Sequence, residues 1–93
     1  MNDPVAAEAC FRVYSRPGCH LCEVLIDELL PLIRGKASLE VCDIDSRSDW
    51  HEQFGLEIPV VELNGERLCH FTLDRAAISA ALRRVREKRP VTG

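Results

Sequence analysis

The sequence predicts an α/β fold in which three helices flank one mixed four-stranded sheet. Segments rich in β-branched and aromatic residues alternate with segments of helical periodicity, which gives the order β-α-β-α-β-β-α. The first two strands are separated by a helix, so they should run parallel through a right-handed crossover. The last two are joined by Asn64-Gly65, a strong hairpin signal. A chain of 93 residues suits one domain, which we place at residues 10–89, between a disordered tail at 1–9 and a tail at 90–93.

The first strand and the first helix lie next to each other in the sequence. Residues 10–15 are aromatic and β-branched and predict a strand. Apolar residues then recur at spacings of three and four, which predicts a helix from about residue 19 to residue 34, ending at Gly35. Pro31 lies inside this helix and removes the hydrogen bond to the carbonyl of Asp27, so we expect a kink there.

The second strand and the second helix follow. Residues 38–45 suit a strand. Ser46 or Ser48 can cap a short helix that carries Trp50 and Phe54 on one face, and Gly55 would close it.

The last three elements form a hairpin and a helix. Residues 58–63 and 66–70 read as its two strands, and Thr72 is expected to cap a helix that ends before Pro90. The apolar side of that helix is predicted to contain Leu73, Ala76, Ala77, Ala80, Ala81 and Val85.

Composition excludes several classes of function. The net charge is −3, and charged residues of both signs make up 29% of the chain without an aromatic-rich basic stripe, so we expect no nucleic-acid partner. No apolar run approaches the ~20 residues of a membrane span, and the N-terminus lacks the features of a secretory signal. We therefore expect a cytoplasmic monomer. In a reducing compartment, a close cysteine pair is more often catalytic or metal-binding than structural.

The most informative motif is Cys19-His20-Leu21-Cys22, at the start of the first helix. Two residues three apart on a helical turn place their Cβ atoms ~5–6 Å apart, which a disulfide can span with small adjustments. Cys19 falls near the N-cap, where unpaired N–H groups and the helix dipole stabilise a thiolate. Cys22 lies one turn further in. We therefore predict that Cys19 attacks a substrate disulfide and that Cys22 resolves the mixed disulfide.

Other interpretations of these residues stay open. His20, if protonated, would stabilise the thiolate further, or it simply faces solvent. Alternatively, the two cysteines are an inert dithiol or half of a zinc site. A zinc site needs further ligands, and the remaining cysteines and histidines are scattered singly along the sequence. We therefore expect no metal. Cys10, Cys42 and Cys69 are expected to act as small hydrophobic residues within strands, with Cys69 the most exposed of the three.

Residues 14–22 and 55–61 together resemble the glutaredoxin-like group of thioredoxin-fold proteins. The resemblance covers about residues 10–87 and includes the order of the elements. It implies that Pro59 is preceded by a cis peptide bond and packs against the dithiol. It also implies that the backbone of Ile58 is free to pair with an extended substrate. A trans proline that merely starts a strand is the alternative.

The resemblance also implies a glutathione site. Arg16 stands where these proteins carry a basic residue that meets a carboxylate of glutathione, and Asp74 stands where they carry an acidic contact. The glycine pair that belongs to this site is absent, and His70 and Phe71 stand in its place. Arg16 is otherwise a surface arginine, and Asp74 an acid of a first helical turn. We therefore expect no bound cofactor and treat glutathione as an alternative ligand.

These observations favour a small thiol-disulfide oxidoreductase or electron carrier. Its partners would be a disulfide-bearing protein or small thiol, and a reductase that the sequence does not name. Three alternatives remain: a binding module without turnover, a protein that bridges an iron–sulfur cluster between two chains, and a redox-responsive regulator. The absent glycine pair and the basic residues between Arg83 and Arg89 motivate the binding module, although basic residues also simply stabilise a helix C-terminus.

Overall fold

The computed structural model describes residues 9–88 of the chain. Its elements follow the predicted order, with one additional 3-10 helix, η1. They are β1 (Cys10–Ser15), α2 (His20–Ile33), β2 (Ser38–Asp43), η1 (Ile44–Ser46), α3 (Ser48–Phe54), β3 (Val60–Leu63), β4 (Glu66–His70) and α4 (Arg75–Lys88). Residues 1–8 of the tail predicted at 1–9, the tail predicted at 90–93, and residue 89 of the predicted domain lie outside the described residues.

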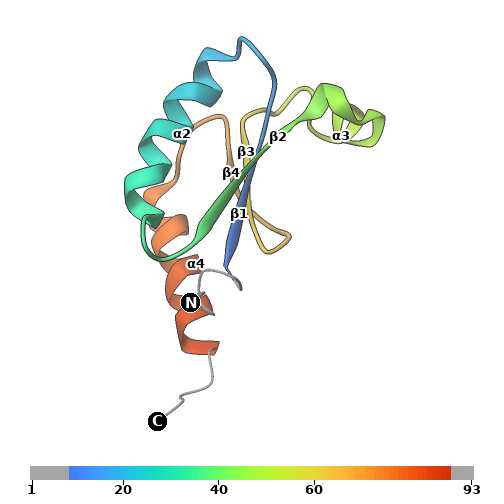
Figure 1. Ribbon diagram of the computed structural model, residues 1–93. Coiled ribbons are helices and arrows are strands. Elements are labelled where there is room, and N and C mark those ends of the chain that lie inside the picture. Colours follow the sequence, from blue (N-terminus) through green and yellow to red (C-terminus); the bar gives the residue numbers. More distant parts are fainter. Residues whose placement is uncertain (1–8, 89–93) are drawn as a thin grey trace.

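The four strands form one mixed sheet in the order β2-β1-β3-β4. β1 and β2 are parallel, whereas β1 and β3, and β3 and β4, are antiparallel. Helices α2 and α4 lie on one face of this sheet and the short α3 lies on the other (Figure 1). The predicted α/β class and mixed four-stranded sheet are therefore confirmed.

The main core lies between the sheet and the two longer helices. Leu25 and Leu29 of α2 pack with Phe11 and Val13 of β1, and all four side chains are buried. Burial of one such side chain stabilises the fold by about 1.5–3 kcal/mol. This packing of helix on sheet holds α2, and with it the first helical turn, in place. Ala9, which the sequence prediction assigns to the tail, is fully buried in the same core.

A second, smaller core covers the other face of the sheet near α3. Tyr14 stacks on Phe54 with ring centroids 4.0 Å apart, and Trp50 meets Tyr14 edge-on at 5.5 Å. Cys42 and Ile44 complete the buried set beside them. The prediction that Trp50 and Phe54 share one face of the helix agrees with this packing, because both rings contact Tyr14.

The ends of α2 and α3 differ in how glycine is used. Gly35 adopts a φ of +76°, which favours glycine, just beyond the end of α2. Gly55 caps α3 with an ordinary right-handed φ of −55°, but a Cβ there would lie 2.6 Å from the carbonyl oxygen of His51. The kink expected at Pro31 stays a prediction.

The capping residue predicted for α3 is wrong. Arg47 occupies the N-cap position without a side-chain hydrogen bond, and Ser48 is already the first helical residue. The Ser46 hydroxyl instead donates to the carbonyl of Asp43, at 2.6 Å. The second strand ends earlier than expected because Asp43 caps η1, where its carboxylate accepts the N–H of Asp45 at 2.9 Å.

The hairpin between β3 and β4 has the predicted turn. Asn64 and Gly65 have φ values of +50° and +89°, the left-handed pair that a tight two-residue turn needs. The strand before it starts at Val60 rather than at residue 58. Its pairing with β4 shifts between Val61 and Glu62, so β4 contains one extra residue at this irregularity.

Helix α4 begins later than predicted, and its cap is Asp74 rather than Thr72. The Asp74 carboxylate accepts the N–H of Ala77 at 3.0 Å, while its carbonyl accepts the N–H of Ile78 at 3.1 Å. The first hydrogen bonds of this helix therefore start from Asp74.

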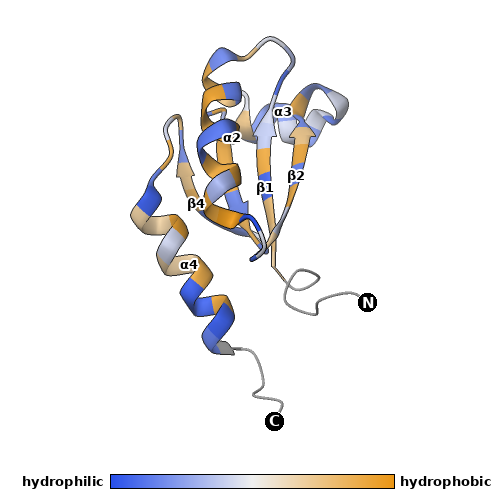
Figure 2. Ribbon diagram, turned by 60° about the vertical axis from the view of Figure 1, so that its left-hand side comes forward, coloured by the Kyte–Doolittle hydropathy of each residue, from blue (hydrophilic) through white to orange (hydrophobic). Residues whose placement is uncertain are grey.

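The apolar side of α4 differs in part from the predicted one. The helix buries Ile78 and Ala81, with Leu82 and Val85 partly buried beside them, whereas Ala76 is exposed. Ile78 and Leu82 belong to this side although the pattern of alanines does not indicate them. Figure 2 shows that hydrophilic residues prevail in the C-terminal half of the helix, which extends beyond the sheet. The fully buried residues Ile78 and Ala81 lie in the first half of α4, and Leu82 and Val85 extend the contact with the core into the second half.

We predict that Asp74→Ala lowers the free energy of unfolding by about 1 kcal/mol, because it removes the N-cap hydrogen bond of α4. Urea unfolding followed by circular dichroism measures this loss. Thr72→Ala serves as the matched control and should change the free energy of unfolding by less than about 0.5 kcal/mol. Equal losses in the two variants would contradict the assignment of Asp74 as the cap.

Candidate functional site

The topology brings four chain segments to one end of the sheet. β1 and β2 run parallel and finish there, β3 starts there, and β4 finishes there, as the pairs Tyr14 with Val60 and Val60 with His70 show. The segments that continue beyond this end contain the dithiol motif, η1, the Ile58-Pro59 bond and Phe71. Residues that are far apart in the sequence therefore share one end of the molecule.

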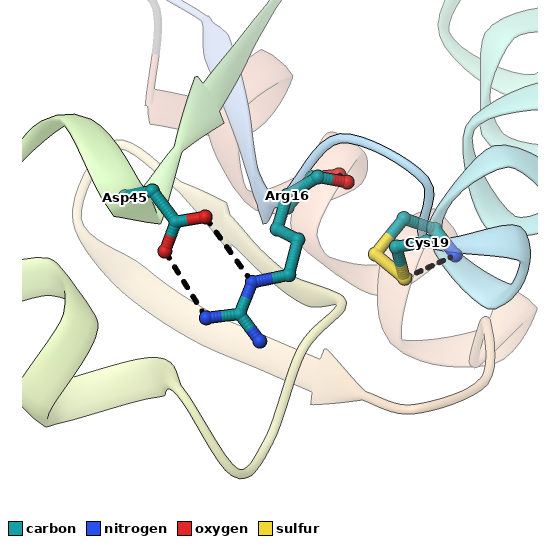
Figure 3. Close-up of a disulfide and its surroundings, with 5 residues drawn as sticks. Arg16, Cys19 and Asp45 are labelled. Atoms are coloured by element: carbon teal, nitrogen blue, oxygen red, sulfur yellow. Dashed lines mark hydrogen bonds and ion pairs between the residues drawn. A yellow bond between two sulfur atoms is a disulfide. The ribbon is translucent and has the colours of Figure 1, made fainter.

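Cys19 and Cys22 form a disulfide at the start of α2, with their Cα atoms 5.2 Å apart (Figure 3). Cys19 is the N-cap residue, and its Sγ accepts the N–H of Cys22 at 3.1 Å. Its carbonyl accepts the N–H of Glu23 at 3.1 Å, the first hydrogen bond of the helix. The predicted placement of Cys19 at the N-cap is therefore observed.

The two sulfur-bearing residues differ in burial. Cys19 is partly exposed, whereas Cys22, in the first turn of the helix, is only 1% exposed. A sulfur at an N-cap faces unpaired N–H groups and the positive end of the helix dipole, both of which stabilise negative charge. This arrangement suits an outer sulfur that reacts with other molecules and an inner sulfur that reacts with its neighbour.

Pro59 follows a cis peptide bond and is fully buried. Its carbonyl accepts the N–H of Phe71 at 2.9 Å, which joins the segment before β3 to the segment after β4. Within residues 9–88, no hydrogen bond involves the backbone N–H or carbonyl of Ile58. The cis bond expected from the resemblance is thus observed, while contact between Pro59 and the disulfide stays a prediction.

Arg16 is engaged by a residue that the sequence did not single out. Its guanidinium donates from Nη2 to Oδ1 of Asp45 at 3.0 Å and from Nε to Oδ2 at 3.3 Å (Figure 3). This bidentate contact lowers the pKa of the Asp45 carboxyl and raises the pKa of Arg16. Nε2 of His51 lies 3.9 Å from the same carboxylate. Asp45 lies in η1, an element that the sequence did not predict, so nothing in the sequence pointed to this pair.

The other predicted site residues are placed more simply. His20 is exposed beside the disulfide. Asp74 is exposed and caps α4, so it has a structural role whether or not it also binds a ligand. Phe71 was not predicted to be a site residue: it is exposed with a φ of +67°, and its ring lies 4.6 Å from that of His70. An exposed phenylalanine in the left-handed region is uncommon, which makes Phe71 a candidate functional residue.

The remaining cysteines are free thiols in β1, β2 and β4. Cys10 and Cys69 are partly buried and Cys42 is buried, so Cys69 is not distinguished from Cys10 in its class of exposure. Burial raises the pKa of the thiols of Cys42 and Cys69. Across residues 9–88, no three His, Cys, Asp or Glu side chains are grouped so that they could hold a metal ion.

The fold and this disulfide define a thiol-redox class of protein. Residues 12–83 match the family described as Glutaredoxin-like domain (DUF836). The match spans more than half of the chain, and the protein belongs to this family. The thioredoxin-like fold and the Cys19–Cys22 disulfide support a thiol-redox role.

Solved structures agree with this assignment. The protein XcR50 from X. campestris is 27% identical, with a TM-score of 0.61 over 80% of this chain and 96% of its own. A mutant thioredoxin from Halobacterium salinarum is 18% identical, with a TM-score of 0.61 over 89% of this chain and 79% of its own. Mitochondrial thioredoxin 3 from Saccharomyces cerevisiae, in its oxidised form, is 15% identical, with a TM-score of 0.60 over 83% of this chain and 78% of its own. The two thioredoxins show the fold alone.

No curated protein sequence matches the chain. Among the described residues, no helix is both long enough and apolar enough to cross a membrane.

We predict that Cys42 is the slowest of the three free thiols to react with iodoacetamide. Burial limits access, and the raised pKa of Cys42 means that less of it is thiolate at pH 8 than for an ordinary cysteine, whose pKa is about 8.5. Its rate should therefore increase mainly above that pH. Peptide mass spectrometry of the oxidised protein measures the three rates.

The control is the same reaction in urea, where the rates of Cys10, Cys42 and Cys69 should converge. If Cys42 reacts as fast in the folded protein as in urea, its assignment as a buried, protonated thiol is wrong.

Proposed function

We propose that the protein is a small thiol-disulfide oxidoreductase, or electron carrier, that cycles between a Cys19–Cys22 dithiol and the disulfide. The observation that carries the proposal is the disulfide at the N-cap of α2, with one sulfur partly exposed and the other buried. The family and the fold add support, since both belong to the thioredoxin superfamily.

The proposed reaction starts from the reduced protein. The Cys19 thiolate attacks one sulfur of a substrate disulfide, which forms a mixed disulfide and releases the other substrate sulfur as a thiolate that takes a proton from solvent. The Cys22 thiol loses its proton, and its thiolate then attacks Sγ of Cys19. This step forms the Cys19–Cys22 disulfide and releases the second substrate thiol. Two electrons pass to the substrate, and a thiol reductant returns the protein to the dithiol.

The N-cap explains why the two cysteines would have these roles. The helix N-terminus stabilises the thiolate of Cys19 both as nucleophile and as the group released when the mixed disulfide between Cys19 and the reductant is resolved. Cys22 is too buried to meet a large substrate, but its N–H already contacts the sulfur of Cys19, so it is placed for the intramolecular step. His20 is exposed beside them and, when protonated, would favour the thiolate further.

The segment before β3 would hold the substrate. The unpaired backbone groups of Ile58 are suited to one rung of strand addition with an extended peptide, and Pro59 would form the wall beside the dithiol. Such backbone pairing favours a protein disulfide over a small molecule. We therefore propose a disulfide-bearing protein as substrate and a separate cytoplasmic reductase as electron donor.

The residues present do not fit a glutathione site well. The guanidinium of Arg16 is engaged by Asp45, the carboxylate of Asp74 caps α4, and the exposed Phe71 lies where ligand and backbone would need to approach closely. We propose that the protein works without glutathione or another cofactor.

A binding module without turnover is the second candidate. The same unpaired backbone at Ile58 would hold a partner even if the dithiol never cycled. An iron–sulfur cluster shared between two chains is a variant of this idea, since Cys19 is the accessible thiol. Absorbance and iron content of the anaerobically purified protein distinguish a plain binding module from a cluster-bridging protein. Visible absorbance together with bound iron supports a cluster, and colourless, iron-free protein contradicts it.

We predict that Cys19→Ser abolishes reduction of insulin by dithiothreitol in the presence of the protein, because it removes the nucleophile. Cys22→Ser should accumulate a mixed disulfide with the substrate, because the resolving thiol is absent. Turbidity measures turnover, and non-reducing mass spectrometry detects the trapped species.

Cys69→Ser is the matched control, since it removes a partly buried thiol from β4 and should leave turnover unchanged. The proposed roles fail if Cys19→Ser retains turnover, or if Cys22→Ser and Cys19→Ser trap equal amounts of mixed disulfide.

A further inference from the structure

The cation nearest to the dithiol in the sequence is Arg16, and its backbone is tied to the motif. The carbonyl of Arg16 accepts the N–H of Cys19 at 3.2 Å. From this point the side chain extends toward Asp45 and away from the disulfide, as Figure 3 shows. The positive charge of Arg16 is therefore directed to a carboxylate of the protein itself.

Asp45 is held in position to receive this charge. Its N–H donates to the Asp43 carboxylate at 2.9 Å, and the Ser46 hydroxyl donates to the Asp43 carbonyl at 2.6 Å, so two residues of η1 are bonded to its N-cap residue. Asp43 also acts electrostatically on Arg16. The contact with Asp45 is bidentate and occupies the Nε and Nη2 edge of the Arg16 guanidinium, one of the edges by which it could bind another carboxylate.

Apart from His20 and the N-terminus of α2, the surface beside the dithiol described by the structure includes apolar and acidic side chains. Leu21 and Val24 on α2 are exposed, as is Phe71 beyond β4 at the same end of the sheet. Glu23, in the first turn of α2, adds negative charge next to the motif. An anionic disulfide would meet apolar side chains and carboxylates here, whereas an uncharged disulfide would meet no repulsion.

We propose that Asp45 is a specificity-determining residue: by holding Arg16, it makes the dithiol discriminate against anionic disulfides and in favour of disulfides in uncharged, apolar segments. The inference rests on the proposed function to the extent that Cys19 is the reacting group. It names uncharged, apolar segments as the class of substrate, and it attributes the discrimination between disulfides to an ion pair outside the Cys19–Cys22 motif.

Two alkylating reagents of similar size test this charge selection without any turnover. In each reaction the Cys19 thiolate forms an S–C bond and displaces iodide, and the reagents differ in that iodoacetamide is neutral and iodoacetate is anionic. The ratio of the two rates at reduced Cys19, measured by peptide mass spectrometry, reports the local charge. Comparing rates as a ratio cancels changes in the amount of thiolate.

We predict that Asp45→Asn raises the rate of iodoacetate relative to iodoacetamide by roughly three- to tenfold, because it releases the guanidinium of Arg16, three residues before Cys19, from its carboxylate partner. Adding Arg16→Gln to Asp45→Asn should remove this gain. Asp49→Asn is the matched control: Asp49 forms a similar exposed ion pair with Arg47 on α3, so the same change of charge there should leave the ratio within about a factor of two.

Steady-state reduction of two small disulfides tests the same charge selection on substrates. Asp45→Asn should increase kcat/KM for dithiodiglycolate by a similar factor, while kcat/KM for the neutral hydroxyethyl disulfide stays unchanged. An unchanged alkylation ratio in Asp45→Asn, or an equal change in Asp49→Asn, would overturn the proposal. If neither small disulfide is reduced but the alkylation ratio shifts as predicted, the charge selection at Cys19 stands, and the oxidoreductase function fails only if insulin is not reduced either.

Discussion

The first turn of α2 is the constraint on which the rest of the site depends. Cys19 is at once the last residue of the loop after β1 and the N-cap of the helix, and its sulfur accepts the N–H of Cys22. The helix can present this turn because Leu25 and Leu29, one and two turns further on, are buried against the sheet. Core packing therefore fixes the position of the disulfide, and the helix end sets its electrostatic surroundings.

The order of the strands supplies the remaining parts of the site. Because β3 is antiparallel to β1, the Ile58-Pro59 bond lies at the end of the sheet where β1 delivers Cys19. The hydrogen bond between Phe71 and Pro59 then adds the end of β4 to the same region. Arg16 and Asp45 form an ion pair in the same region, and both side chains are partly exposed to water. Such a pair contributes little to stability, and its effect would be on which substrates approach.

Local sequence signals predicted most of the architecture. The bounds of β1 and β4 were correct to the residue: Pro17-Gly18 follows the first strand and Asn64-Gly65 precedes the second. Errors arose where side chains compete for one helix end: Thr72 and Asp74 are both good caps by type, and only the path of the chain after β4 decides between them. The same applies to Ser48, which the structure places inside α3.

The candidate site was predictable only in part. The dithiol motif and its position at a helix start follow from sequence spacing, and the cis bond before Pro59 followed from the resemblance. The pairing of Arg16 with Asp45 joins residues 29 positions apart through an element that has no distinct sequence signal. The left-handed backbone of Phe71 is likewise set by its contact with Pro59 and not by its residue type.

The central claim is that Cys19 and Cys22 cycle reversibly between dithiol and disulfide. A redox titration in glutathione and dithiothreitol buffers, quenched with a thiol-blocking reagent and read by mass spectrometry, tests it directly. We predict one two-electron transition of this pair, with a midpoint between about −270 and −120 mV, the range of related disulfide proteins. A pair that stays in one state across that range, or a transition that persists in Cys19→Ser, would contradict the claim.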